Sequence, residues 1–146
     1  MKYIVKVTTK IKNDILLSQI KSLGYKNIDG VSSSKLYLFK GNISKDTIFY
    51  ITKVLLVDPV IEEYQILSKF KKEKDKTVIN IWNKPQVLDV VAIYVLKGIR
   101  YLGIEENVEV HTGTQLCILP QQNEIKIKSI VEKIFMNPLI QYYEII

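Results

Sequence analysis

The sequence predicts an α+β fold made of two copies of one small module. Residues 58–66 and 137–145 share the ending Pro-x-Ile-x-x-Tyr-x-Ile and lie 79 residues apart. A Leu-Gly pair at residues 23–24 recurs with the same separation at residues 102–103. Alternating and helical apolar patterns also follow one another in the same order in both halves. The two halves are therefore expected to form the same strands and helices.

Each copy has the pattern strand, helix, long strand, helix, strand. Strands are predicted where apolar and polar residues alternate or β-branched residues dominate, at residues 2–9, 31–39, 60–67, 77–82, 108–119 and 139–146. Helices are predicted where apolar residues recur at helical spacing, at about residues 14–23, 45–56, 89–102 and 124–135. The long strands are candidates for a bend at Ser34 and at Gly113. Each copy is then β-α-β-α-β, or β-α-β-β-α-β if the long strand breaks.

The predicted helix ends carry their own signals. Asp14 and Asp89 are candidate N-caps, because a carboxylate at that position accepts the free amide hydrogens of the first turn. Gly24 and Gly103 stand where the first helix of each copy should end, since glycine adopts the left-handed conformation at little cost. A proline ends the second helix of each copy, because the residue before proline is pushed out of the helical region. These prolines are Pro59 and Pro138.

The 146 residues divide into a first copy at 1–67, a charged linker at 68–76 and a second copy at 77–146. A copy of this length buries only a modest core. The helical segment 90–96 is apolar nearly all round, so both of its sides need cover. The copies are therefore expected to pack as a pseudo-twofold pair, like a homodimer fused into one chain. Further self-association, and a small ligand between the copies, are left open.

The charge distribution argues against nucleic acid as a partner. The net charge is +6, but residues 68–76 carry half of it, with five lysines and two acidic residues. The second copy has a net charge of −1, and Arg100 is the only arginine. Base and phosphate recognition favours the forked guanidinium of arginine. A lysine-rich solvated surface is the interpretation that we favour. Salt-dependent retention on DNA would instead support a nucleic-acid-binding protein.

The sequence contains few residues in patterns that suit catalysis, cofactor binding or metal binding. The six glycines show neither phosphate-loop nor dinucleotide spacing, so no cofactor is predicted. His111 is the only histidine, which argues against a His-pair metal site. Cys117 is the only cysteine and lies in an apolar strand pattern, where a small buried residue is expected. Glu62-Glu63 and Glu105-Glu106 are not expected to form acid/base pairs, because neighbours on a strand point to opposite faces. They are expected to be solvated charges. No catalytic residue is predicted.

The location is expected to be cytoplasmic. A single cysteine excludes an internal disulfide, and no apolar run approaches the roughly 20 residues of a membrane span. The first residues alternate as in a strand and do not have the pattern of a signal peptide.

Several motifs resemble one known family. In the first copy they are residues 23–25 (Leu-Gly-Tyr), 34–35 (Ser-Lys) and 55–64 (Leu-Leu-Val-Asp-Pro-Val-Ile-Glu-Glu-Tyr). In the second copy they are residues 84–89 (Lys-Pro-Gln-Val-Leu-Asp), 102–104 (Leu-Gly-Ile), 113 (Gly) and 137–138 (Asn-Pro). The chain, apart from its linker, thus resembles a tandem copy of PurS, the small subunit of phosphoribosylformylglycinamidine synthase.

The resemblance implies a non-catalytic role within an ATP-dependent carbon–nitrogen ligase. PurS-like subunits dimerise, bridge a PurQ-type glutaminase to a PurL-type synthetase, and help ammonia pass between them in purine biosynthesis. A fused tandem copy would replace the dimer. The family's strand-two arginine is replaced by Ser32 and His111, and its lysine and glycine survive only as Lys35 and Gly113. Each copy is therefore expected to keep a different part of the partner surface.

Six residues are candidates for partner contact. Tyr64 and Tyr143 recur at matched positions, and tyrosine suits a surface that is apolar at one end and wet at the other. Packing on the sheet is the competing interpretation for both. Lys35 either contacts a partner carboxylate or faces water. The other candidates, taken from the matched motifs, are Lys84, Asp89 and Gly113.

A second function remains open, that of a small-molecule-sensing regulatory module with ferredoxin-like repeats. Such modules bind amino acids at a paired interface and carry a glycine-rich turn between strand one and helix one. The corresponding turns here, residues 12–14 and 85–87, contain no glycine. This observation favours the bridging subunit.

Overall fold

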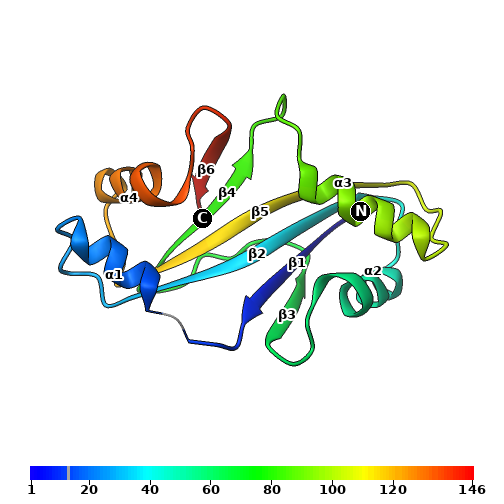
Figure 1. Ribbon diagram of the computed structural model, residues 1–146, viewed down its shortest axis with the longest axis horizontal. Coiled ribbons are helices and arrows are strands. Elements are labelled where there is room, and N and C mark those ends of the chain that lie inside the picture. The colour runs from blue at the N-terminus through cyan, green and yellow to red at the C-terminus, as the bar shows by residue number, and fades with distance from the viewer. Residues whose placement is uncertain (13) are drawn as a thin grey trace. The chain divides into compact units, whose positions relative to one another are not determined.

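The computed structural model describes residues 1–12 and 14–146, and Asn13, which belongs to the predicted turn at residues 12–14, lies outside the described residues. Within them the fold is α+β, as predicted (Figure 1). The strands are β1 (Lys2–Thr9), β2 (Gly30–Gly41), β3 (Glu62–Leu67), β4 (Thr77–Asn83), β5 (Val108–Leu119) and β6 (Gln141–Ile145). The helices are α1 (Ile15–Ser22), α2 (Lys45–Ile51), α3 (Val90–Tyr101) and α4 (Glu124–Ile130).

The sheet has six strands in the order β3-β1-β2-β5-β4-β6. β1 pairs antiparallel with both β2 and β3, and β4 pairs antiparallel with β6. β2 and β5 are continuous, so each copy is β-α-β-α-β and the long strands do not break. Gly24 and Gly103 end α1 and α3 with φ of 98° and 81°, as their positions predicted.

The hydrogen bonds repeat with the sequence. Ser44 caps α2 by accepting from the Thr47 amide at 3.1 Å, and Asn123 caps α4 by accepting from the Lys126 amide at 2.9 Å. Ser44 and Asn123 lie 79 residues apart. A side-chain oxygen at each N-cap satisfies an amide that the helix cannot. The local structure therefore follows the duplication seen in the sequence.

The turn after each second helix also repeats. Asp58 Oδ1 accepts from the Val60 amide at 2.9 Å, and the Asp58 amide donates to Glu62 Oε1 at 3.0 Å. Asn137 makes the same two bonds with Leu139 and Gln141, each at 3.0 Å. Because these turns include the first two residues of each predicted last strand, β3 and β6 begin two residues later than the alternation predicted.

Both second helices widen in their last turn, where the prediction had one continuous α-helix. The widened turns are η1 (Thr52–Leu56) and η2 (Val131–Phe135). Ile51 and Leu56 are both buried and lie five residues apart, a spacing that i to i+5 bonding brings to one face. In η2 the Met136 amide donates to the Val131 carbonyl, which has the same spacing.

The chain forms two compact units that do not follow the repeat boundaries. Unit 1 contains residues 1–11, 34–70 and 88–113, and unit 2 contains residues 12–33, 71–87 and 114–146. Unit 1 thus takes β1, α2 and β3 from the first copy and α3 from the second. Unit 2 takes α1 from the first copy and β4, α4 and β6 from the second. Each copy contributes its first helix to the unit that holds the other copy's second helix.

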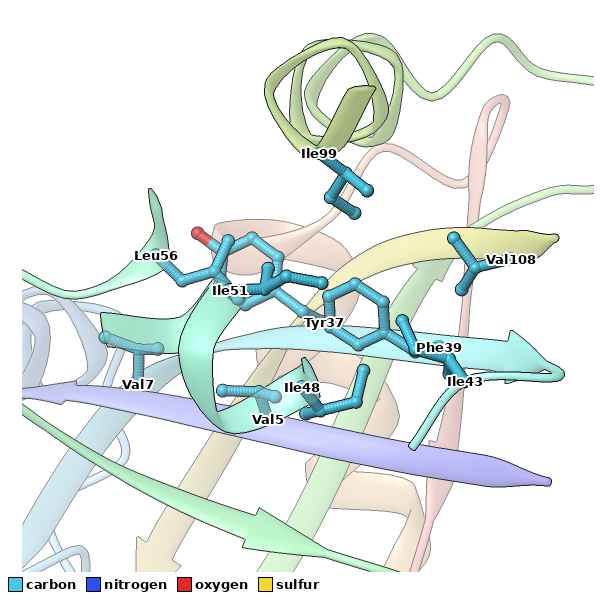
Figure 2. Close-up of a cluster of buried hydrophobic side chains, with 10 residues drawn as sticks. All are labelled: Val5, Val7, Tyr37, Phe39, Ile43, Ile48, Ile51, Leu56, Ile99 and Val108. Atoms are coloured by element: carbon cyan, nitrogen blue, oxygen red, sulfur yellow. The ribbon is translucent and has the colours of Figure 1, made fainter. Parts of the chain in front are cut away.

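The core of unit 1 lies between helices of both copies and the strands β1, β2 and β5, the last of which belongs to the second copy (Figure 2). Ile99 of α3 is fully buried and points toward Ile51 and Tyr37 in Figure 2. α3 approaches η1 closely, since a Cβ added at Gly98 would lie 3.1 Å from Leu55 Cδ1. A larger residue at position 98 would require the Leu55 side chain to shift.

The core of unit 2 is built in the same way. Ile20 of α1 is fully buried among Ile79, Ile118 and Ile130, which come from β4, β5 and α4. Tyr25, three residues after the end of α1, donates its hydroxyl hydrogen to Ser129 Oγ of α4. A helix from the first copy is therefore held to the second copy's elements by apolar packing and by a hydrogen bond.

Candidate functional site

Four of the six candidate contact residues belong to unit 1, namely Lys35, Tyr64, Asp89 and Gly113. Lys84 and Tyr143 belong to unit 2. The six therefore do not form one cluster within a unit. The role of each of these six residues therefore depends on its own local contacts.

Lys35 forms an ion pair within its own chain. Its Nζ lies 3.1 Å from Glu62 Oε2, with the lysine side chain 61% exposed and the glutamate side chain 13% exposed. Val7 of β1 pairs with Lys35 on one side and with Tyr64 on the other. These three residues therefore form a row across β2, β1 and β3. The carboxylate that Lys35 contacts here is this chain's Glu62.

Glu62 is a site residue that the sequence analysis placed in a solvated carboxylate pair. The hydrogen bond from the Asp58 amide lowers the pKa of Glu62, and Lys35 lowers it further, while partial burial opposes both effects. Burial raises the pKa of the neighbouring Tyr37 hydroxyl, with Lys35 acting against that shift and Glu62 adding to it. The sequence carried one signal for the role of Glu62. Gln141, which matches Glu62 in the second copy, is also a side-chain acceptor four residues after the first residue of the turn.

Glu62→Gln is expected to destabilise the protein by about 0.5–1 kcal/mol at pH 7. The variant keeps an acceptor for the Asp58 amide, as Gln141 does for Asn137, but loses the charge that Lys35 faces. Because the folded pKa of Glu62 is lowered, the stability from its ionised form is fully present above the usual value of 4.5. That stability is lost as the pH falls through the lowered folded pKa.

Urea unfolding at pH 7 and at pH 3 measures this difference. The difference in the free energy of unfolding between wild type and Glu62→Gln should be smaller at pH 3 than at pH 7. Glu63→Gln is the matched control, because Glu63 is the exposed neighbour on the opposite face of β3. A gap that is equal at both pH values would contradict the role given to the charge.

Tyr64 and Tyr143 are both half-buried against a core. The Tyr64 ring meets the Phe49 ring edge-on, with centroids 6.1 Å apart and planes at 66°. Burial raises the pKa of Tyr143, and Glu132 and Glu124 add to the shift. Both tyrosines therefore contribute to packing on the sheet while part of each ring stays accessible.

Asp89 holds α3 to β5. Its Oδ1 accepts from the Ala92 amide at 3.0 Å, which makes it the predicted N-cap. The same carboxylate accepts from the Thr112 hydroxyl at 2.7 Å and, through Oδ2, from the Thr112 amide at 2.8 Å. Gly113 is the next residue of β5 and is partly exposed. Asp14, the other predicted N-cap, makes no side-chain bond to its helix.

Lys84 lies just after β4 and is half-buried. Its backbone closes the loop before α3: the Lys84 amide donates to the Ile140 carbonyl, and its carbonyl accepts from the Val87 amide, each at 2.9 Å. The role visible for Lys84 is therefore structural and lies in its main chain.

A buried polar network in unit 2 escaped the sequence analysis. Asn80 is fully buried, accepts from Gln115 Nε2 at 2.9 Å and donates to Glu144 Oε1 at 3.3 Å. Glu144 Oε1 also accepts from Trp82 Nε1 at 3.0 Å. Buried polar groups are tolerated when they are paired in this way. The signal was Asn80, a polar residue within the otherwise apolar residues 78–82 of β4.

His111 and Cys117 each lie near a carboxylate. His111 contacts Glu109, two residues earlier on β5, because alternate residues of a strand share a face. Cys117 is half-buried, with its Sγ 3.9 Å from Glu73 Oε2, so it is less buried than predicted. Within residues 1–12 and 14–146, no three His, Cys, Asp or Glu side chains are grouped so that they could hold a metal ion.

Comparison with known proteins adds no relative. No model of a known protein family matches the chain, and no curated protein matches it. In the part of the chain that the structure describes, no helix combines the length and apolar character needed to span a membrane. The resemblance to PurS therefore rests on the motif residues named above.

Proposed function

We propose that this chain is a non-catalytic, PurS-type subunit of phosphoribosylformylglycinamidine synthase that acts in the cytoplasm. It bridges the glutaminase and the ATP-dependent synthetase subunits and aids the transfer of ammonia between them. The observation that carries the proposal is the exchange of first helices, because both compact units draw on both copies. A two-chain assembly with exchanged helices, once fused end to end, would divide in this way. The chain would then supply alone what the family supplies as a dimer.

The duplicated turn supports the same proposal. The most specific motif of the resemblance, residues 55–64, holds the hydrogen-bonded turn between Asp58 and Glu62. Its counterpart keeps the geometry but replaces both carboxylates by the amides of Asn137 and Gln141. The first copy thus presents a charged Lys35–Glu62 pair, whereas the second has the uncharged Thr114 and Gln141 at the matched positions. Unequal copies suit a bridge between two different partners.

The test is reconstitution with purified candidate synthetase and glutaminase subunits from the same organism. Glutamine-driven amidine synthesis should rise when this chain is added, while ammonia-driven synthesis should change little. Bovine serum albumin at equal concentration serves as the control for crowding. If both reactions are indifferent to the chain, the bridging proposal fails.

Light scattering after size exclusion tests the fused-dimer part separately. We expect a folded monomer of 16.9 kDa from the isolated chain. A chain that folds only as a dimer would contradict the idea that its two copies replace two subunits.

A further inference from the structure

The outward side of α3 is apolar although it is exposed. Tyr94 is 67% and Tyr101 is 92% exposed, and Val90 and Val91 are exposed as well. Val90, Tyr94 and Tyr101 follow one stripe of the helix, since they are spaced by four and seven residues. The opposite side carries the fully buried Ile99. The sequence predicted that other parts of the chain would cover both sides of α3, whereas only the side that carries Ile99 is covered.

The apolar surface extends from α3 onto η1. Leu55 lies against Gly98 of α3, and both Val54 and Leu55 are exposed. We define the α3 face as the exposed residues Val54, Leu55, Val90, Val91, Tyr94 and Tyr101, all of them in unit 1. Contiguous exposed apolar residues usually mark a contact surface.

The internal repeat shows that the fold does not require an aromatic residue at position 101. Tyr101 matches Ser22 of α1, 79 residues earlier, and Gly98 and Lys97 match Gln19 and Ser18. All three α1 residues are polar and exposed, and Ser22 bonds back to the Gln19 carbonyl. Polar residues are thus compatible with this side of the first helix in one copy. Tyr94 matches the exposed Ile15, so both copies are apolar there, whereas Tyr101 calls for a role outside folding.

The charges beside the middle of the α3 face favour one kind of partner. α3 contains Lys97 and Arg100 and no acidic residue, and the acidic residues Asp89, Glu105 and Glu106 lie beyond its two ends. Lys97 Nζ lies 5.6 Å from the Tyr94 ring centroid, and Lys53 Nζ of η1 lies 4.5 Å from the Phe49 ring centroid. A second copy docked face to face would bring these cations together, which is unfavourable. An acidic border on the partner would be complementary.

We propose that the α3 face docks an amphipathic segment of another protein, apolar along its centre and bordered by Asp or Glu. This inference rests on the proposed function, in which that protein is the synthetase or the glutaminase. Tyr94 and Tyr101 supply the apolar contact, because tyrosine offers a large surface that loses little conformational freedom. Lys97 and Lys53 supply the charge that orients the segment.

Titration calorimetry of the full chain against each purified subunit tests the proposal. The double variant Tyr94→Ser/Tyr101→Ser and the single variant Lys97→Glu should each bind at least about tenfold more weakly than wild type. The matched control is Ile15→Ser, which changes the exposed α1 residue at the position equivalent to Tyr94 and should bind as wild type does. Circular dichroism melts verify that all the variants are folded.

Each outcome decides something different. If wild type binds a subunit and the α3 variants bind it equally well, the docking face is wrong and the bridging proposal stands. If wild type binds neither subunit, the bridging proposal is overturned and the docking inference falls with it. If light scattering shows a wild-type dimer that the double variant abolishes, a second copy occupies the face and the acidic partner is excluded.

Discussion

Replacing Ile99 with alanine is expected to lower the free energy of unfolding by about 3 kcal/mol. Ile99 is fully buried in the core of unit 1, where it comes from the second copy and packs among first-copy residues such as Ile51 and Phe39. The loss combines the transfer free energy of the removed methyl and methylene groups with the cost of the cavity that they leave. An equal effect is expected for Ile20→Ala, because Ile20 holds the matched position in the core of unit 2.

Urea unfolding followed by circular dichroism measures both variants against a control on the same helix. Val91→Ala removes part of an exposed side chain of α3 and should change stability by less than about 0.5 kcal/mol. A similar small effect for Ile99→Ala would mean that α3 does not pack in this core, and the exchange of first helices would be refuted.

Asp89→Ala is expected to cost about 2–3 kcal/mol of stability. One carboxylate accepts three hydrogen bonds, from the Ala92 amide and from the amide and hydroxyl of Thr112. The substitution removes the cap of α3 and leaves the partly buried Thr112 donors without this partner. Asp89→Asn should cost less stability than Asp89→Ala, because its remaining oxygen still accepts from the Ala92 amide. Part of the cost remains, because its NH2 group then faces the Thr112 amide and both groups are donors.

Asp14→Ala is the matched control, because Asp14 occupies the same place before α1 without a side-chain bond to the helix. Its thermal midpoint should stay close to that of wild type, whereas the midpoint of Asp89→Ala should fall by several degrees. Equal shifts for the two variants would show that the link to Thr112 contributes nothing.

Much of the local structure could be predicted because its causes are local. β1 and β5 have the predicted bounds, and Gly24 and Gly103 end their helices where the pattern placed them. Asp89 was found as a cap from its place before an apolar helix, but its bonds to Thr112 join residues 23 positions apart and have no short-range signature. Glu62 was missed for a similar reason: Lys35, which faces it, lies on another strand.

The sequence by itself determined that there are two matched sets of elements, the order of those elements along the chain, and that their first helices must be covered by apolar residues. Only the tertiary structure decided which strands each helix covers. Ile20 and Ile99 have the same helical spacing whichever strands they pack on, because hydrophobic burial has no direction. The choice depends on β2 and β5, which pass from one unit to the other at Ser34 and Gly113 and lead each first helix to strands that belong to the other copy.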